Sequence, residues 1–137
     1  MKKINSEVYV ATPDQKIFDV VTQNKGKAVL TSIDHLTGTD RVYEVFKVHL
    51  NSEPDLIINL QGDMPNIQPK AISVLLSYMQ QGNCDIGTLA SSFSSDDELV
   101  DENTVKVAVK EQLIAGKFSK AIDFFRIDKK EYENFYH

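Results

Sequence analysis

The feature that most constrains the fold is the run Asp55 to Pro65, in which an apolar segment ends abruptly in Gln61-Gly62-Asp63. Leu56 to Leu60 is short and almost wholly apolar, which predicts a strand buried on both faces of a sheet. In an open α/β sheet, ligands lie beyond the carboxyl ends of the strands, so Asp63 is expected at a binding edge. Gly62 lets the backbone pass close to a ligand, and an Asp63 carboxylate there suits Mg²⁺ that also binds phosphates. The alternative is an ordinary turn capped by an aspartate.

The composition indicates one globular domain and excludes several classes of partner. The chain has 137 residues, of which 42% are hydrophobic and 26% charged. Its net charge of −5 argues against nucleic acid or an anionic membrane as the main partner. No apolar run reaches membrane-spanning length, and no signal-peptide core follows the N-terminus. The single cysteine, Cys84, has no disulfide or zinc partner, which predicts a cytoplasmic protein and a small buried side chain there.

Strand and helix patterns alternate along most of the chain. Thr12 and Pro13 predict one helix start, Thr39 or Asp40 another, and Pro69 a third. The alternation β-α-β-α-β-α-β predicts a three-layer α/β/α fold with a mostly parallel sheet. After it, an acidic loop with a short helical turn precedes an appended hairpin near the C-terminus. Strands are expected at 7–11, 27–30, 56–60 and 85–90, helices at 13–24, 40–49, 70–81 and 96–100, and the hairpin strands at 104–109 and 113–118.

A second polar stretch, His35 to Arg41, follows a predicted strand and precedes a predicted helix. It is therefore expected on the same edge as Asp63. Thr37-Gly38-Thr39 offers open backbone and two hydroxyls, which suit the polar edge of a base or a ribose. Arg41 can direct a planar set of donors at a phosphate or carboxylate. The alternative is a helix cap with Arg41 on a solvated face, and His35 is expected to be structural or exposed rather than a metal ligand.

Taken together, three ordered motifs resemble the 3-deoxy-manno-octulosonate (Kdo) cytidylyltransferases, also called CMP-Kdo synthetases. The family patterns H-x-S/T-G-T-D/E-R, N-V-Q-G-D-x-P and N-x-V-K-V match His35–Arg41, Asn59–Pro65 and Asn103–Val107. Val10-Ala11-Thr12 and Phe118-Ser119-Lys120 fit two further family stretches. The resemblance covers nearly the whole chain and implies a Rossmann-like nucleotidyltransferase sheet.

The resemblance also implies an activity and a set of site residues. The family transfers CMP from CTP to Kdo, releasing pyrophosphate with help from Mg²⁺, for lipopolysaccharide synthesis. Phosphoryl-type transfer needs mainly positioning and charge neutralisation, so no covalent nucleophile is required. The implied roles are Asp63 as the catalytic Mg²⁺ ligand, Thr37, Gly38, Thr39 and Arg41 around the nucleotide, and Gln61, Lys120 and His137 toward the substrate.

Several departures from the family pattern predict that this chain alone is inactive. Family members are about twice as long as this domain-sized chain. The basic loop that holds the CTP phosphates in the family, and its late metal-binding aspartate, have no match here. Pro13 replaces an aspartate and Lys120 an arginine, while His137 matches the start of the sugar-acid site. The sequence thus predicts a single partial domain over 1–137. Two strands left without the family's first strand between them predict a homo-oligomer, most simply a dimer.

Two other functions remain open from the sequence. One is a non-catalytic remnant or subunit that binds a partner or assembles with itself. The other is a receiver-like phosphoacceptor domain, because Pro54 to Ile58 and Met64-Pro65 faintly resemble the pattern of receiver domains. In that register, however, the acceptor aspartate falls on Leu60.

Overall fold

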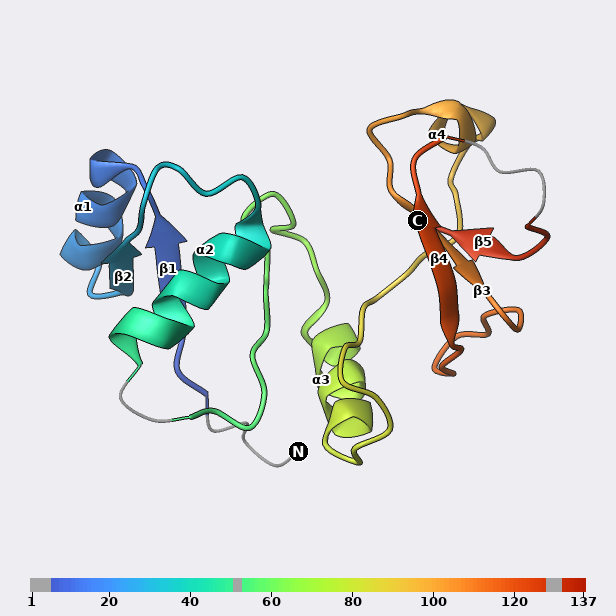
Figure 1. The fold of residues 1–137 in the computed structure, drawn as a ribbon, viewed down its shortest axis with the longest axis horizontal. Coiled ribbons are helices and arrows are strands. Elements are labelled where there is room, and N and C mark those ends of the chain that lie inside the picture. The colour runs from blue at the N-terminus through green and yellow to red at the C-terminus, as the bar shows by residue number, and fades with distance from the viewer. Residues whose placement is uncertain (1–5, 51–52, 128–131) are drawn as a thin grey trace. The chain divides into compact units, whose positions relative to one another are not determined.

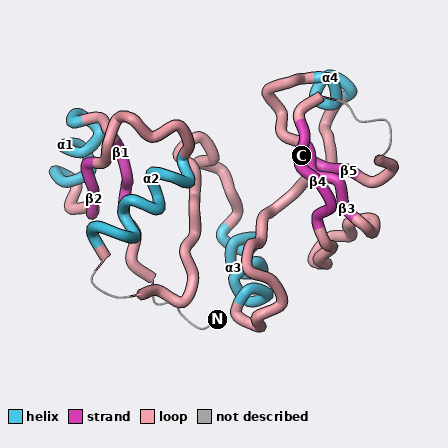
Figure 2. Tube along the Cα trace, viewed as in Figure 1, coloured by secondary structure: helices cyan, strands magenta, loops and turns pink. Residues whose placement is uncertain are grey.

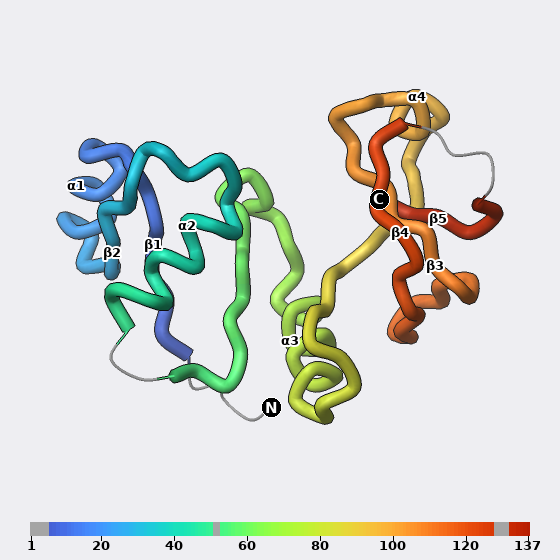
Figure 3. The backbone as a smooth tube through the Cα atoms, viewed as in Figure 1, coloured from blue at the N-terminus to red at the C-terminus, as the bar shows by residue number. Residues whose placement is uncertain are grey.

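The computed structural model describes residues 6–50, 53–127 and 132–137. It divides into two compact units, Met1–Pro65 and Asn66–His137. Figure 1 shows the elements of each unit, and Figure 3 traces the chain through them in sequence order. The expected single domain over 1–137 and its three-layer order stay predictions. Within the described residues, no helix is both long and apolar enough to cross a membrane.

The first unit is built on a parallel β-α-β arrangement. Strands β1 (Tyr9–Thr12) and β2 (Lys27–Leu30) pair in parallel, with Tyr9 opposite Lys27 and Thr12 opposite Leu30. Helix α1 (Gln15–Gln23) connects them and packs against both. This part of the predicted parallel sheet is confirmed.

Helix α1 begins and ends on local signals. Asp14 caps it by accepting hydrogen bonds from the backbone N–H groups of Lys16 (2.7 Å) and Ile17 (3.4 Å). The helix therefore starts after Asp14, and the predicted start with Thr12 as cap and Pro13 as first helical residue is wrong by two positions. At the other end Lys25 has a φ of 63°, and a Cβ on Gly26 would lie 2.7 Å from Val21 Cγ1. Glycine is required at 26 because the chain turns back tightly against the helix.

Helix α2 (Gly38–Glu44) continues into a π-helical turn, η1 (Val45–His49). It begins two or three residues earlier than predicted, because Thr37 and not Thr39 or Asp40 is the N-cap. Helix α2 packs against β1, and Val45 is buried in the small core with Val29 of β2.

The predicted central strand 56–60 is not formed. Its residues adopt no regular secondary structure, and Ile57, Ile58 and Leu60 are about half exposed, at 49%, 47% and 52%. The expected strand at 85–90 is also absent, and Ile86 is 88% exposed there. In the described chain β1 and β2 pair only with each other, and neither apolar run is part of a sheet. The predicted four-stranded parallel sheet is therefore wrong for the described residues, as the tube in Figure 2 shows.

The second unit contains two helices and an antiparallel sheet. Helix α3 (Pro69–Met79) has proline at its first position as predicted, and α4 (Asp96–Val100) confirms the short acidic helix. Gly87 lies against α3, where a Cβ would come within 2.9 Å of both Met79 Sδ and Leu75 Cδ1. Cys84 is exposed, so its predicted burial is wrong.

The sheet of this unit has the order β4-β3-β5. Strand β3 (Lys106–Val109) is central, and all four of its residues are buried. Its partner is β4 (Ala121–Phe125), so the predicted antiparallel pairing is confirmed, but the predicted partner strand 113–118 is wrong. A longer connection replaces the expected tight hairpin. Strand β5 (Phe135–Tyr136) adds a third strand that the irregular aromatic pattern did not predict.

Candidate functional site

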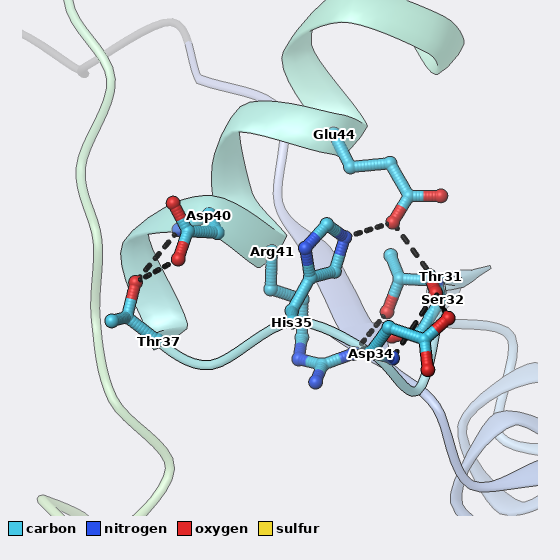
Figure 4. A network of polar contacts seen from close by, with 8 residues as sticks. All are labelled: Thr31, Ser32, Asp34, His35, Thr37, Asp40, Arg41 and Glu44. Carbon is cyan, nitrogen blue, oxygen red and sulfur yellow. Dashed lines mark hydrogen bonds and ion pairs between the residues drawn. The ribbon is translucent and has the colours of Figure 1, made fainter.

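The loop 31–37 and the start of α2 form a dense polar network, drawn in Figure 4. Thr37 Oγ1 accepts a hydrogen bond from the backbone N–H of Asp40 (3.1 Å) and donates to Asp40 Oδ2 (2.6 Å). Both capabilities of the Thr37 hydroxyl are thus used in capping the helix. The neighbouring Gly38 is open, since nothing lies within 4 Å of where a Cβ would stand. The helix start therefore presents uncovered backbone.

Arg41 turns back from α2 to hold the end of β2. Its Nη1 donates to Thr31 Oγ1 at 2.6 Å and to the Ser32 carbonyl at 2.8 Å. Thr31 is buried, and its own N–H donates to the carbonyl of Thr12 at the end of β1. The alternative of Arg41 on a solvated face is wrong, because the side chain is half-buried and fastens the loop to the sheet. Nε and Nη2 have no hydrogen-bond partner among the described residues, so they are free to meet an anion.

Glu44 holds the same loop from one helical turn further on. Its Oε2 accepts a hydrogen bond from the backbone N–H of Ser32 at 3.0 Å and pairs with His35 Nε2. The hydrogen bond from His35, and then the one from Ser32, lower the pKa of the Glu44 carboxyl below its usual value of 4.5. The expectation that His35 is structural agrees with this pairing. Glu44 itself went unnoticed in the sequence, although its position three residues after Arg41 places both on one helix face.

Asp63 and Gln61 belong to the turn that follows the 56–60 segment. The backbone N–H of Met64 donates to the Gln61 carbonyl at 3.2 Å, and a Cβ on Gly62 would meet nothing within 4 Å. Asp63 is exposed, and its carboxylate has no hydrogen-bond partner among residues 6–50, 53–127 and 132–137. In Figures 1 and 4 the segment that leads to this turn passes the N-terminal end of α2.

The described residues contain no cluster of three or more potential metal ligands. The donor set at Asp63 is therefore a single exposed carboxylate. Such a set fits Mg²⁺ bound through one carboxylate with phosphate oxygens and water completing the shell. It does not fit a metal ion held by protein groups alone.

Lys120 and His137 both belong to the second unit. Lys120 is exposed, and its carbonyl accepts a hydrogen bond from the Lys110 N–H at 3.1 Å. The His137 backbone exchanges two hydrogen bonds with Ser91 (2.8 and 3.1 Å), and its ring stacks on Phe93 with centroids 5.2 Å apart. His137 Nε2 also donates to the Ser92 carbonyl at 3.1 Å. Local contacts therefore fix the His137 ring, and a substrate role for either residue remains a prediction.

A parallel β-α-β unit with polar loops beyond its strand ends defines the α/β class of proteins that bind ligands at a sheet edge. The family model for cytidylyltransferases matches residues 1–136, and the chain belongs to this family. The resemblance drawn from the three motifs is thereby confirmed, and the receiver-like alternative is excluded.

Individual relatives agree with the family assignment. The chain is 38% identical over 124 residues to 3-deoxy-manno-octulosonate cytidylyltransferase from Thermodesulfovibrio yellowstonii, covering 87% of this chain and 49% of that protein. It is 34% identical over 134 residues to 8-amino-3,8-dideoxy-manno-octulosonate cytidylyltransferase from Shewanella piezotolerans, covering 96% and 55%. A solved CMP:2-keto-3-deoxy-manno-octonic acid synthetase complexed with CTP superposes with a TM-score of 0.73 at 33% identity, covering 96% and 52%. The chain thus spans about half the length of the relatives it matches.

Proposed function

We propose that this chain contributes a CTP site to the transfer of CMP onto an octulosonate sugar acid, either Kdo or 8-amino-Kdo. The observation that carries the proposal is the open backbone at Gly38, on a loop that Arg41 and Glu44 hold to the sheet. Relatives named for both sugar acids match this chain, and a solved relative holds CTP. The two acceptors differ at a position that the described residues do not specify, so both remain substrates to test.

The reaction requires positioning more than covalent chemistry. The anomeric hydroxyl oxygen of the sugar acid forms a bond to the α-phosphorus of CTP, the bond to the bridging oxygen of pyrophosphate breaks, and the hydroxyl proton is released. In our proposal Thr39 and the Gly38 backbone meet the cytidine, and the free N–H groups of Arg41 meet a phosphate. Asp63 would hold Mg²⁺, which neutralises phosphate charge when bound.

The test of CTP binding is an NMR titration of the ¹⁵N-labelled chain with CTP in the presence of Mg²⁺. The amide chemical shifts of residues 37–41 and 61–65 are expected to change first, and these changes should saturate as CTP is added. GTP is the matched control, because it carries the same triphosphate and a larger base. Equal shifts with GTP, or shifts scattered over both units, would overturn the proposed site.

The metal role of Asp63 has its own test. Mn²⁺ should broaden the amide signals of residues 61–65 before others, and Asp63→Asn should abolish this effect. Asp55→Asn is the control, because Asp55 is another exposed carboxylate on the same segment. Broadening centred on Asp96–Glu98 would show that Mn²⁺ prefers the acidic helix and that the assignment is wrong.

We further propose that the isolated chain forms CMP-Kdo too slowly to detect. To neutralise a triphosphate, the proposed site would have the single Asp63 carboxylate for a metal ion and the Arg41 guanidinium, one nitrogen of which already binds Thr31 and Ser32. Loss of two or three charge-assisted contacts worth about 1.5–3 kcal/mol each is enough to abolish measurable turnover. Pyrophosphate release that depends on added Kdo or 8-amino-Kdo would contradict this.

The same chain has a feature that favours self-association. Ile57, Ile58 and Leu60 are about half exposed on a segment without a strand partner, where unpaired backbone and apolar side chains promote association. A homo-oligomer, most simply a dimer, is the proposed state. Light scattering at micromolar concentration should show it, and Ile58→Ser should shift it toward monomer. A compact monomer that melts cooperatively would refute the proposal.

A further inference from the structure

The seven-residue loop Thr31–Thr37 is held by polar contacts and not by packing. Its two apolar side chains, Ile33 and Leu36, are 80% and 96% exposed, so they contribute no buried surface to its conformation. Backbone hydrogen bonding to β1 reaches only Thr31, and helix capping reaches only Thr37. Ser32 Oγ accepts a hydrogen bond from the Asp34 N–H at 3.1 Å and donates to Asp34 Oδ2 at 3.2 Å, but these bonds join loop residues only to each other. Side chains from elsewhere must therefore attach the middle of the loop to the rest of the unit.

Those side chains come from α2, and they meet at one residue, Ser32. The Ser32 carbonyl accepts a hydrogen bond from Arg41 Nη1 at 2.8 Å, while its N–H donates to Glu44 Oε2 at 3.0 Å. The backbone on both sides of Ser32 is thus held by groups of opposite charge from a single helix. Glu44 Oε2 also holds the ring of His35, three residues further along. Figure 4 shows both contacts converging on one carboxylate oxygen.

We infer that Glu44 is a positioning residue for nucleotide binding: through Ser32 and His35 it holds the loop in the shape that leaves Gly38 exposed to the ligand. This inference rests on the proposed CTP site. Glu44 does not itself touch the nucleotide; it acts by keeping the binding-competent loop conformation populated.

The size of the effect follows from that population. Without the Glu44 carboxylate, Ser32 N–H and His35 lose their common acceptor. Apart from the Ser32–Asp34 hydrogen bonds within the loop, residues 32–36 then keep only the Arg41 contact. If the competent conformation falls to about a tenth of the molecules, the apparent Kd for CTP rises about tenfold. Glu44→Gln keeps an acceptor oxygen for Ser32 N–H but loses the charge that favours the His35 ring N–H. Its effect should therefore lie between those of wild type and Glu44→Ala.

The experiment compares Glu44→Ala, Glu44→Gln and a control, Glu53→Ala, which removes the same charge from an exposed position. The first readout needs no ligand: amide hydrogen exchange at Ser32, whose N–H donates to Glu44, and the His35 ring tautomer from ¹⁵N-labelled histidine. The second is the Kd for CTP with Mg²⁺. We expect Glu44→Ala to lose protection at the Ser32 amide and to bind about tenfold more weakly, Glu44→Gln to be intermediate, and Glu53→Ala to match wild type.

Two results would overturn the inference while leaving the proposed function intact. One is unchanged exchange at Ser32 together with an unchanged His35 ring tautomer in Glu44→Ala. The other is a freed loop whose affinity for CTP equals that of wild type. Failure of the wild-type chain to bind CTP refutes the proposed function, and with it the positioning role. Should Glu44→Ala not fold, the ordering of wild type, Glu44→Gln and Glu53→Ala still decides the question.

Discussion

Replacing Lys106 should destabilise the second unit more than any exposed charge change. Lys106 has no exposed surface, and its ammonium donates to the carbonyls of Asp101 (2.5 Å) and Arg126 (2.8 Å). It thereby ties the loop before β3 to the end of β4. Lysine is rarely buried to this degree, and the two carbonyls explain why it is tolerated here.

The cost of Lys106→Ala has two parts. Three buried methylenes contribute about 0.8 kcal/mol each, or about 2.4 kcal/mol in all. Two carbonyls are left without their donor, at about 1–3 kcal/mol for each that stays buried, and relief of the ammonium's own desolvation offsets part of this. We expect a loss of about 3–5 kcal/mol in the free energy of unfolding of this unit. Lys106→Met keeps the stem and should lose only about 1–3 kcal/mol.

The assay is urea unfolding followed by the intensities of NMR amide signals from residues 66–127, because the chain has no tryptophan. Lys110→Met, at the exposed residue that follows β3, is the matched control and should stay within about 0.5 kcal/mol of wild type. Lys106→Met as stable as wild type, or more stable, would refute the reasoning. It would mean that the two carbonyl contacts do not offset the cost of burying the charge.

Three further predictions concern local contacts. Asp14→Ala should lose about 1 kcal/mol of stability in the first unit by removing the α1 cap, measured by urea unfolding, and Asp14→Ser should recover most of it. Gly26→Ala should lower the melting temperature, because its Cβ would lie 2.7 Å from Val21 Cγ1; an unchanged melting temperature would show that the turn relaxes freely. Stability should fall as the pH drops from about 6 to about 3, since the pKa values of Glu44 and Asp101 lie below their usual 4.5 and 3.8. The contribution of these two carboxylates to the free energy of unfolding is complete above their usual pKa values, and it is lost as the pH falls through their folded-state pKa values. The midpoint of urea unfolding, measured at a series of pH values, would reveal this loss.

The sequence predicted most elements whose signals are local. The Pro69 start of α3, the stop of α1 at Asn24–Gly26 and the short helix at 96–100 depend on hydrogen bonds between residues a few positions apart. Errors in the helix starts were small, because Thr12, Asp14, Thr37 and Thr39 are all competent caps and only the fold selects among them. The three family motifs also lie in short contiguous stretches, so the family itself could be identified from the chain alone.

The candidate site was predicted in part. The sequence located the loop at Thr37–Arg41 and the turn at Gln61–Asp63, but it did not predict that Arg41 would turn inward to Thr31 and Ser32. Nor did it single out Glu44, because a glutamate near the end of a helix looks like a solvated side chain until its acceptor geometry is known. The buried Lys106 looked like one charged residue in an alternating strand.

What the sequence by itself determined is therefore the family, the helices and the places where polar residues interrupt apolar runs. What only the tertiary structure decided is which strands pair. The 56–60 run has the composition of a central strand yet joins no described ladder, and β3 pairs with 121–125 instead of 113–118. The physical reason is that the backbone groups of a strand form their hydrogen bonds with a neighbouring strand and not within the strand itself. A strand therefore forms only where a distant part of the chain supplies that partner.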